Sequence, residues 1–260
     1  MPTLTPGQFS LVYNMLSFTV ASMLAAFVFF VMARGNLAPK YRISMMVSAL
    51  VVGIAAYHYW RIFGSWNDAY ALSGGMYTPT GEPFNDAYRY VDWLLTVPLL
   101  LVELVLVMGL ERKKQESLLT RLIIAAALMI ATGYPGEIAT DNTTRAIWGF
   151  VSTLPFVYIL YVLWAELGKS IPNQPPRAQV LLKNTRLLLL LTWGFYPIAY
   201  MAPFFGLTGS GAEIVLQVGY SIADVAAKAG YGLMIYAIAR AKTEASGWSV
   251  ESSTAAAATV

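Results

Sequence analysis

The chain has 260 residues, of which 57% are hydrophobic and only 12% are charged, and its mean hydropathy is +0.57. A soluble domain carries about twice that charged fraction, so the composition indicates an integral membrane protein. The absence of cysteine and the single histidine exclude disulfides, thiolate chemistry and a metal site built from several histidines.

Seven stretches are long and apolar enough to cross a bilayer, whose hydrocarbon core needs about 20 apolar residues. We place them at 9–33, 43–64, 87–109, 118–136, 144–167, 180–204 and 212–240. The residues before the first stretch contain no basic region and no small-residue cleavage site, so we expect the first helix to remain in the mature chain. The sequence therefore predicts an all-α membrane bundle of seven helices over 1–245, followed by a disordered tail over 246–260.

The connections between the predicted helices alternate in charge. The first, third and fifth are basic, as is the end of the last helix. The second, fourth and sixth hold most of the acidic residues outside the helices: Asp68, Glu82, Asp86, Glu137, Asp141 and Glu213. By the positive-inside rule the N-terminus is extracellular and the C-terminus cytoplasmic. The pI of about 9.0 therefore reflects topology and gives no reason to expect nucleic acid as a partner.

The longest connection, SWNDAYALSGGMYTPTGEPFNDAYR, joins the second and third helices. It places Gly74 and Gly75 beside a run rich in tyrosine and threonine. Glycine pairs between such runs are typical of tight turns between strands. We expect a short extracellular β-hairpin that covers the outer end of the bundle.

The third helix, RYVDWLLTVPLLLVEL, carries polar side chains on one face. At 100° per residue they fall within a stripe about 60° wide and can all face the bundle interior: Arg89, Asp92, Thr96 and Glu103. Eleven residues place Glu103 about 16 Å deeper than Asp92, toward the cytoplasm. One acid could pair with an arginine for stability, but two acids at different depths indicate that an ion moves between them.

The last helix carries Asp224 and Lys228 in the middle of an apolar run. A spacing of four residues brings the two side chains close together on one face. Charged groups are costly at membrane depth, so the pair indicates a functional site. The alternative is a buried ion pair that only fixes helix packing.

The pattern Asp92-Trp93-x-x-Thr96, with Glu103 eleven positions after the aspartate and Asp224-x-x-x-Lys228 in the last of seven helices, resembles the microbial (type 1) rhodopsins. Within them it resembles the proteorhodopsin and xanthorhodopsin group over nearly the whole chain. The resemblance implies a light-driven outward proton pump, not an enzyme, with all-trans retinal bound to Lys228 as a Schiff base. The short loops and the lack of a cysteine pair argue against a receptor of the G-protein-coupled type.

A protonated imine in apolar surroundings needs negative charge beside it. Asp92 and Asp224 supply that charge, and Arg89 offsets the second negative charge. We expect Asp92 to accept the proton and Glu103, in a run of leucine and valine, to stay protonated in the dark and act as donor. Thr96 lies one turn from Asp92 and can hydrogen-bond to it. The resemblance implies the same roles, since a sodium or chloride pump would lack this aspartate.

His58, the only histidine, lies near the outer end of the second helix at about the depth of Asp92. In the proteorhodopsin-like group a histidine of this helix pairs with the acceptor aspartate, and the resemblance implies that pairing for His58. The alternative is an isolated histidine that hydrogen-bonds a backbone carbonyl.

The resemblance also implies the residues of the retinal pocket. Aromatic rings flank the polyene, and Tyr200 stands where many members have tryptophan. A proline can kink the sixth helix. A leucine on the third helix is associated with green absorption. The pocket residues are Trp93, Leu100, Trp193, Tyr196, Pro197 and Tyr200.

Gly149 in the fifth helix stands where many members have a bulky tryptophan beside the retinal ring. In xanthorhodopsin-like members such a glycine accompanies an antenna carotenoid, so the resemblance implies a lateral window that admits a hydroxylated carotenoid. The alternative is a glycine that only permits close packing of helices.

The expected partners are membrane lipid, protons, a carotenoid and further copies of the chain, in a number that the sequence does not set. A photosensory rhodopsin that signals through a membrane partner is the main alternative, although a sensor does not require a donor such as Glu103. A light-independent transporter is a further alternative, which would stay colourless with retinal.

Overall fold

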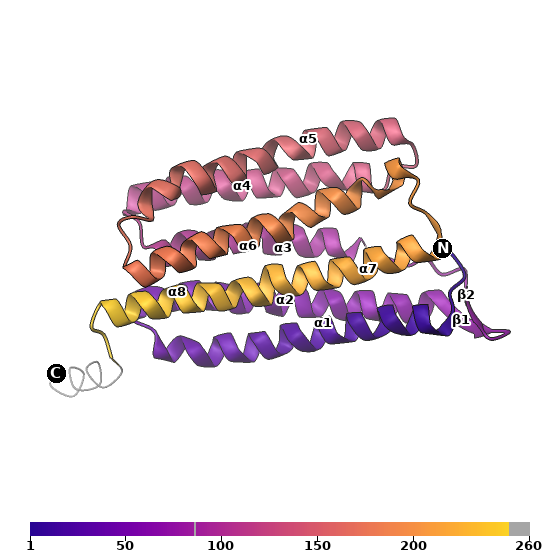
Figure 1. Ribbon diagram of the computed structural model, residues 1–260, viewed down its shortest axis with the longest axis horizontal. Coiled ribbons are helices and arrows are strands. Elements are labelled where there is room, and N and C mark those ends of the chain that lie inside the picture. Colours follow the sequence, from indigo (N-terminus) through magenta and orange to yellow (C-terminus); the bar gives the residue numbers. More distant parts are fainter. Residues whose placement is uncertain (86, 250–260) are drawn as a thin grey trace.

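The computed structural model describes residues 1–85 and 87–249, which form a bundle of long helices lying side by side (Figure 1). The helices are α1 (Pro6–Ala33), α2 (Pro39–Ala69), α3 (Tyr88–Met108), α4 (Arg112–Glu137), α5 (Asn142–Tyr161), α6 (Pro176–Tyr200), α7 (Gly209–Val225) and α8 (Tyr231–Ala245). The π-helical turn η5 (Ala226–Gly230) joins α7 and α8 into one helix. The predicted bundle of seven helices is therefore confirmed for the described residues.

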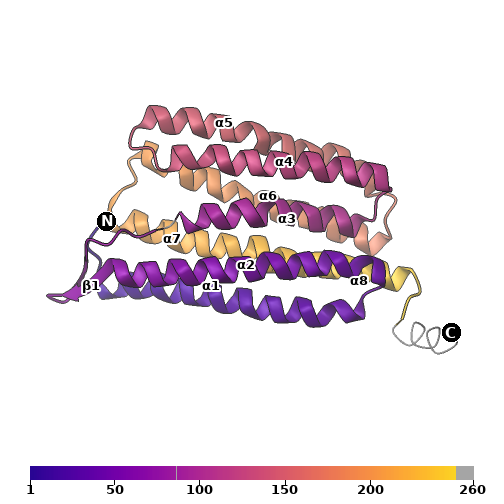
Figure 2. The ribbon, with the colours of Figure 1, turned by 180° about the vertical axis from the view of Figure 1, so that it is seen from behind.

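Six of these helical segments in the described part of the chain are long and apolar enough to cross a membrane. The remaining one, α6, has 25 residues and lies among the others in both views (Figures 1 and 2). The N-terminus lies at one end of the bundle, beside the hairpin, and α8 runs out at the opposite end. A chain that crosses the membrane an odd number of times must begin and end on opposite sides of it.

The apolar stretches mark the membrane core more closely than they mark the helix ends. The helix predicted over 118–136 begins at Arg112 in α4, because a polar turn continues the helix beyond the apolar run. The helix predicted over 144–167 is α5 followed by a π-helical turn, η2 (Val162–Glu166). At the start of α5, Asp141 accepts a hydrogen bond of 2.8 Å from the Thr144 amide, and this bond lowers the pKa of Asp141.

The predicted β-hairpin is present as β1 (Tyr70–Ser73) and β2 (Met76–Pro79), paired antiparallel with Ser73 opposite Met76. Gly74 and Gly75 form its turn with φ of 58° and 83°, a left-handed conformation that glycine adopts without steric cost. The N-terminal segment is tied to the hairpin, because Leu4 bridges to Tyr77 and the ring of Phe9 stacks on that of Tyr77 at 3.8 Å.

Part of the predicted C-terminal tail is in contact with the bundle. Trp248 packs against the buried core, and the Arg42 guanidinium lies 5.6 Å from the centre of its ring. The prediction of disorder otherwise concerns residues 250–260, which lie outside the described residues.

Candidate functional site

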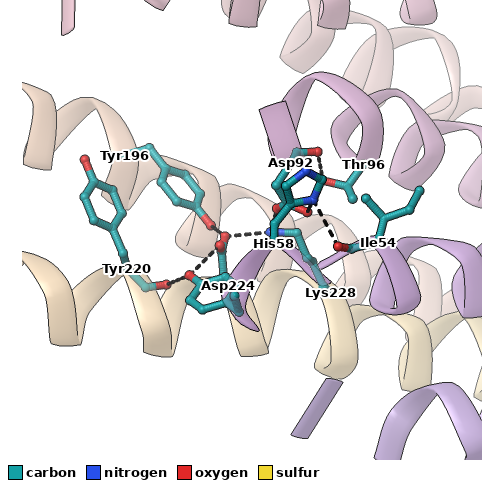
Figure 3. A network of polar contacts seen from close by, with 9 residues as sticks. Ile54, His58, Asp92, Thr96, Tyr196, Tyr220, Asp224 and Lys228 are labelled. Carbon is teal, nitrogen blue, oxygen red and sulfur yellow. Dashed lines mark hydrogen bonds and ion pairs between the residues drawn. The ribbon is translucent and has the colours of Figure 1, made fainter. Parts of the chain in front are cut away.

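Lys228 lies at the centre of the bundle between two carboxylates. Its Nζ is 3.0 Å from Asp92 Oδ2 and 2.8 Å from Asp224 Oδ1 (Figure 3), and all three side chains are buried. The π-helical turn η5 includes Lys228, and such turns occur often at functional sites. Elements α3, α7 and η5 thus bring together one cation and two acids.

Two tyrosine hydroxyls hold the Asp224 carboxylate in place. Tyr59 of α2 donates to Oδ2 at 2.6 Å, and Tyr196 of α6 donates to Oδ1. The hydroxyl of Tyr59 also lies 3.3 Å from the Tyr220 carbonyl oxygen. Asp224 therefore receives two hydroxyl donors in addition to Lys228, whereas the Asp92 carboxylate forms ion pairs with Lys228 and His58.

His58, for which the family resemblance implies a pairing with Asp92, points toward that aspartate and also contacts the backbone (Figure 3). Its Nδ1 is 3.7 Å from Asp92 Oδ1 and 3.0 Å from the carbonyl oxygen of Ile54. The first distance suits an ion pair with a protonated imidazole, and the second suits a hydrogen bond. The same nitrogen thus faces both partners considered above, the Asp92 carboxylate and a backbone carbonyl.

Thr96 and Arg89 flank Asp92 on the same face of α3, both of them buried. The Thr96 hydroxyl donates to the backbone carbonyl of Asp92 at 2.8 Å, so its hydrogen bond is not made to the carboxylate. Arg89 donates to Gln217 Oε1 at 2.5 Å, and Gln217 in turn donates to Glu213 at 2.9 Å. A chain of polar side chains therefore leads from Arg89 toward the hairpin end of the bundle.

Glu103 is completely buried near the opposite end of α3. Ser48 of α2 donates a hydrogen bond to Glu103 Oε2 and also lies 3.3 Å from the Ser44 carbonyl oxygen. It lies in an apolar run of α3 in which Leu104 and Val107 are also buried. The structure thus keeps Glu103 apart from the cluster around Lys228.

An apolar cavity of about 380 Å³ begins at Lys228 and extends between α3, α4, α5 and α6. This volume lies within the range of sites for small organic ligands. All the residues that the sequence predicted for the pocket line it, including the lysine and the glycine of the fifth helix: Trp93, Leu100, Gly149, Trp193, Tyr196, Pro197, Tyr200 and Lys228.

The cavity reaches the outer surface of α5 beside Gly149. Phe150, which also lines it, is 67% exposed. The ring of Tyr200 lies directly against the glycine, since a Cβ at position 149 would be 2.7 Å from Tyr200 Cε1. The Tyr200 hydroxyl donates to the Arg145 carbonyl oxygen at 2.6 Å. Tyr200 therefore occupies the space that the absent side chain leaves on this side of α5.

A seven-helix membrane bundle with a buried lysine between two carboxylates, at the wall of an apolar cavity, defines a class of membrane photoreceptors and pumps. The chain belongs to the bacteriorhodopsin-like protein family, whose pattern it matches over residues 11–242. It is a microbial type 1 rhodopsin of the proteorhodopsin and xanthorhodopsin kind, in a family of light-driven proton pumps that bind retinal.

The relatives agree with this placement. The chain is 33% identical over 220 residues to the green-light absorbing proteorhodopsin of the gamma-proteobacterium EBAC31A08, covering 84% of this chain and 82% of that one. It is 64% identical to xanthorhodopsin, described as a light-driven ion pump with dual chromophore, with a TM-score of 0.92 over 95% of this chain and 99% of that one. It is 54% identical to thermophilic rhodopsin, with a TM-score of 0.93 over 95% and 100% of the two chains.

Sequence reasoning missed three polar residues that complete the site. Tyr59, Ser48 and Gln217 are buried and hydrogen-bond to Asp224, Glu103 and Arg89 respectively. Polar side chains inside predicted membrane helices are a usable signal, but their partners lie on other helices and were not evident from spacing within one helix.

Proposed function

We propose that this protein is a light-driven outward proton pump that binds retinal covalently through Lys228. The observation that carries the proposal is the position of Lys228 Nζ, ion-paired to Asp92 and Asp224 at the wall of the apolar cavity. Aromatic side chains line this cavity, as a long conjugated hydrocarbon ligand requires: Tyr90, Trp93, Phe156, Trp193, Tyr196 and Tyr220. The residues present therefore fit retinal.

Retinal, when bound, supplies the absorption of light and a change of shape on isomerisation. The protein supplies the charges and proton sites. Asp92 and Asp224 neutralise the positive nitrogen of Lys228, which would otherwise be costly to bury. Two tyrosine donors and the lysine stabilise the negative charge of Asp224. Asp92 forms ion pairs with Lys228 and His58 but receives no hydroxyl donor from the residues that the structure describes, so it is the better acceptor for a proton leaving Lys228 Nζ.

Glu103 is proposed as the donor that returns a proton to Lys228 Nζ. Complete burial among apolar side chains disfavours its charged form, so it can hold a proton in the dark. It lies on the side of Lys228 away from the hairpin, while Arg89 and Gln217 lie on the hairpin side. With the hairpin end extracellular, as the charge of the connections indicates, transport is outward.

A photosensory receptor is less consistent with this geometry. A sensor needs the chromophore and its counterion, but it does not need a protonated carboxyl on the inner side for rapid recovery. The complete burial of Glu103 disfavours its charged form and so provides such a carboxyl, and this burial favours a pump.

The first prediction tests transport. Cells that express the chain with retinal should acidify an unbuffered medium in the light, and a protonophore should abolish the change. Lys228→Ala should remove the visible absorption band and acidification, whereas Lys183→Ala, at an exposed lysine of α6, should keep both.

Asp92→Asn should shift the band to the red and stop pumping. Acidification that persists in Lys228→Ala, or normal pumping by Asp92→Asn, would contradict the proposal.

The second prediction concerns the donor. Glu103→Gln should leave the dark absorption almost unchanged, since Glu103 lies about 16 Å from Asp92 along α3. Recovery of the dark state after a flash should slow by about 10²-fold or more at neutral and alkaline pH, as for the loss of a positioned proton donor. Flash spectroscopy of the purified protein measures this rate. Recovery as fast as in the parent would exclude the donor role.

The third prediction separates the two contacts of His58. If the imidazole stabilises ionised Asp92 across 3.7 Å, its loss should favour the protonated aspartate. The red, acid-type spectrum of His58→Ala should then appear at a higher pH than in the parent. Trp60→Ala, at an exposed residue of the same helix whose ring packs against Phe63, is the control. A midpoint that is unchanged or lowered would leave His58 with its backbone contact to Ile54 alone.

We further propose that a hydroxylated carotenoid binds beside Gly149 as an antenna. The cavity reaches the surface of α5 at Gly149, Phe150 and Thr153, so a conjugated chain lying against this helix could approach the bound retinal. The similar structure of xanthorhodopsin is described as having a dual chromophore, which supports a second pigment here.

The fourth prediction tests this window. Adding hydroxylated carotenoids to the retinal-bound protein should produce a new blue band in the action spectrum of pumping. Gly149→Trp should remove the band and keep retinal absorption, because the indole would displace Tyr200 and fill the opening. Ile147→Trp, at an exposed position outside the cavity lining, should keep the band. A band that survives in Gly149→Trp would place the antenna elsewhere, and no band with any carotenoid would leave Gly149 as a packing glycine.

A further inference from the structure

Lys242 is a buried cation at the end of the bundle opposite the hairpin. Its residue surface is only 7% exposed, although it lies near the C-terminal end of α8. The Nζ donates to the carbonyl oxygens of Val107 and Met108 at 2.9 and 2.7 Å. These are the last carbonyls of α3 before its cap, Gly109. Such carbonyls have no partner within the helix and carry the negative end of its dipole, so an ammonium group is well suited to them.

The residue after Lys242 makes a second link between helices. Thr243 Oγ1 accepts a hydrogen bond of 3.1 Å from the amide of Ala38, the residue that precedes α2. The ring of Tyr41, in the first turn of α2, lies 5.2 Å from Lys242 Nζ. Two consecutive residues of α8 therefore join the end of α3 to the beginning of α2.

This junction lies between Glu103 and the end of the bundle. Met108 lies five positions after Glu103, which corresponds to about 7.5 Å along α3. The intervening side chains of Leu104, Val107 and Met108 are at most 2% exposed. A proton that reaches Glu103 from this end must pass through the packed region that Lys242 holds together.

We propose that Lys242 is a positioning residue that closes the cytoplasmic route to Glu103, and that separation of its ammonium from the α3 carbonyls opens this route during recovery. The inference rests on the proposed donor role of Glu103. Both acceptors are neutral oxygens at a helix end, so separation leaves no unpaired buried carboxylate. Water reaching the end of α3 can take the place of the ammonium as hydrogen-bond partner.

The experiment compares Lys242→Met with Arg240→Met in the retinal-bound protein in lipid nanodiscs. Both changes remove one positive charge from α8, but Arg240 is exposed and pairs with Glu244 of the same helix. Two measurements are made: amide hydrogen exchange over 104–109 in the dark, and the rate of recovery after a flash. Lys242→Arg retains hydrogen-bond donors for the α3 carbonyls. Thr243→Val removes the hydrogen bond to Ala38, and it tests the same opening with a second variant if Lys242→Met does not fold.

Lys242→Met and Thr243→Val should increase amide exchange at the end of α3. They should also accelerate recovery at alkaline pH by up to about tenfold, equivalent to about 1.4 kcal/mol in the barrier. Arg240→Met and Lys242→Arg should match the parent in both measurements, and the dark absorption band should be unchanged in all variants.

Unchanged exchange and unchanged recovery in Lys242→Met and Thr243→Val would overturn the proposal and leave Lys242 as a packing residue. Slower recovery in Lys242→Met would also overturn it, because the ammonium would then be supplying protons instead of closing the route. Glu103→Gln is measured alongside. If that variant recovers at the parent rate, the donor assignment fails, whereas the exchange measurement still reports on the junction itself.

Discussion

The structure depends on keeping one positive charge, that of Lys228, buried at membrane depth. Placing a charge there is costly unless opposite charge lies beside it, and Asp92 and Asp224 meet this requirement at 3.0 and 2.8 Å. One cation beside two acids leaves one excess negative charge. Arg89 of α3, which is buried in the same interior, offsets this charge. The polar residues of α2, α3, α6 and α7 therefore face a common centre, while apolar side chains cover the outside.

The two acids differ in how the protein holds them, and the roles that we propose for them rest on this difference. Asp224 is fixed by hydroxyl donors from Tyr59 and Tyr196, which belong to two other helices. Asp92 has Lys228 on one side and the more distant His58 on the other. A carboxylate with fewer donors is easier to protonate. The acceptor role that we propose for Asp92 thus rests on the contacts of Asp224 as much as on those of Asp92 itself.

The sequence predicted the helices, and the residues that it singled out for the central site lie together in the structure, because both depend on patterns within one helix. Seven apolar stretches gave the bundle, and periodicity gave the shared face of Asp92 and Glu103. The contribution of Tyr59 could not be predicted, since it depends on how α2 is rotated against α7. The π-helical turn at Lys228 and the packing of Tyr200 against Gly149 likewise depend on tertiary contacts.

The two ends of the proposed proton path are built differently, and the difference bears on direction. On the hairpin side, hydrogen bonds link Arg89, Gln217 and Glu213 toward the surface. On the other side, buried apolar residues of α3 separate Glu103 from the end of the bundle. A proton released near Asp92 meets polar groups toward the hairpin but a packed apolar layer in the opposite direction. This asymmetry favours outward release while the inner end is closed, and it makes an opening of that end necessary only for recovery.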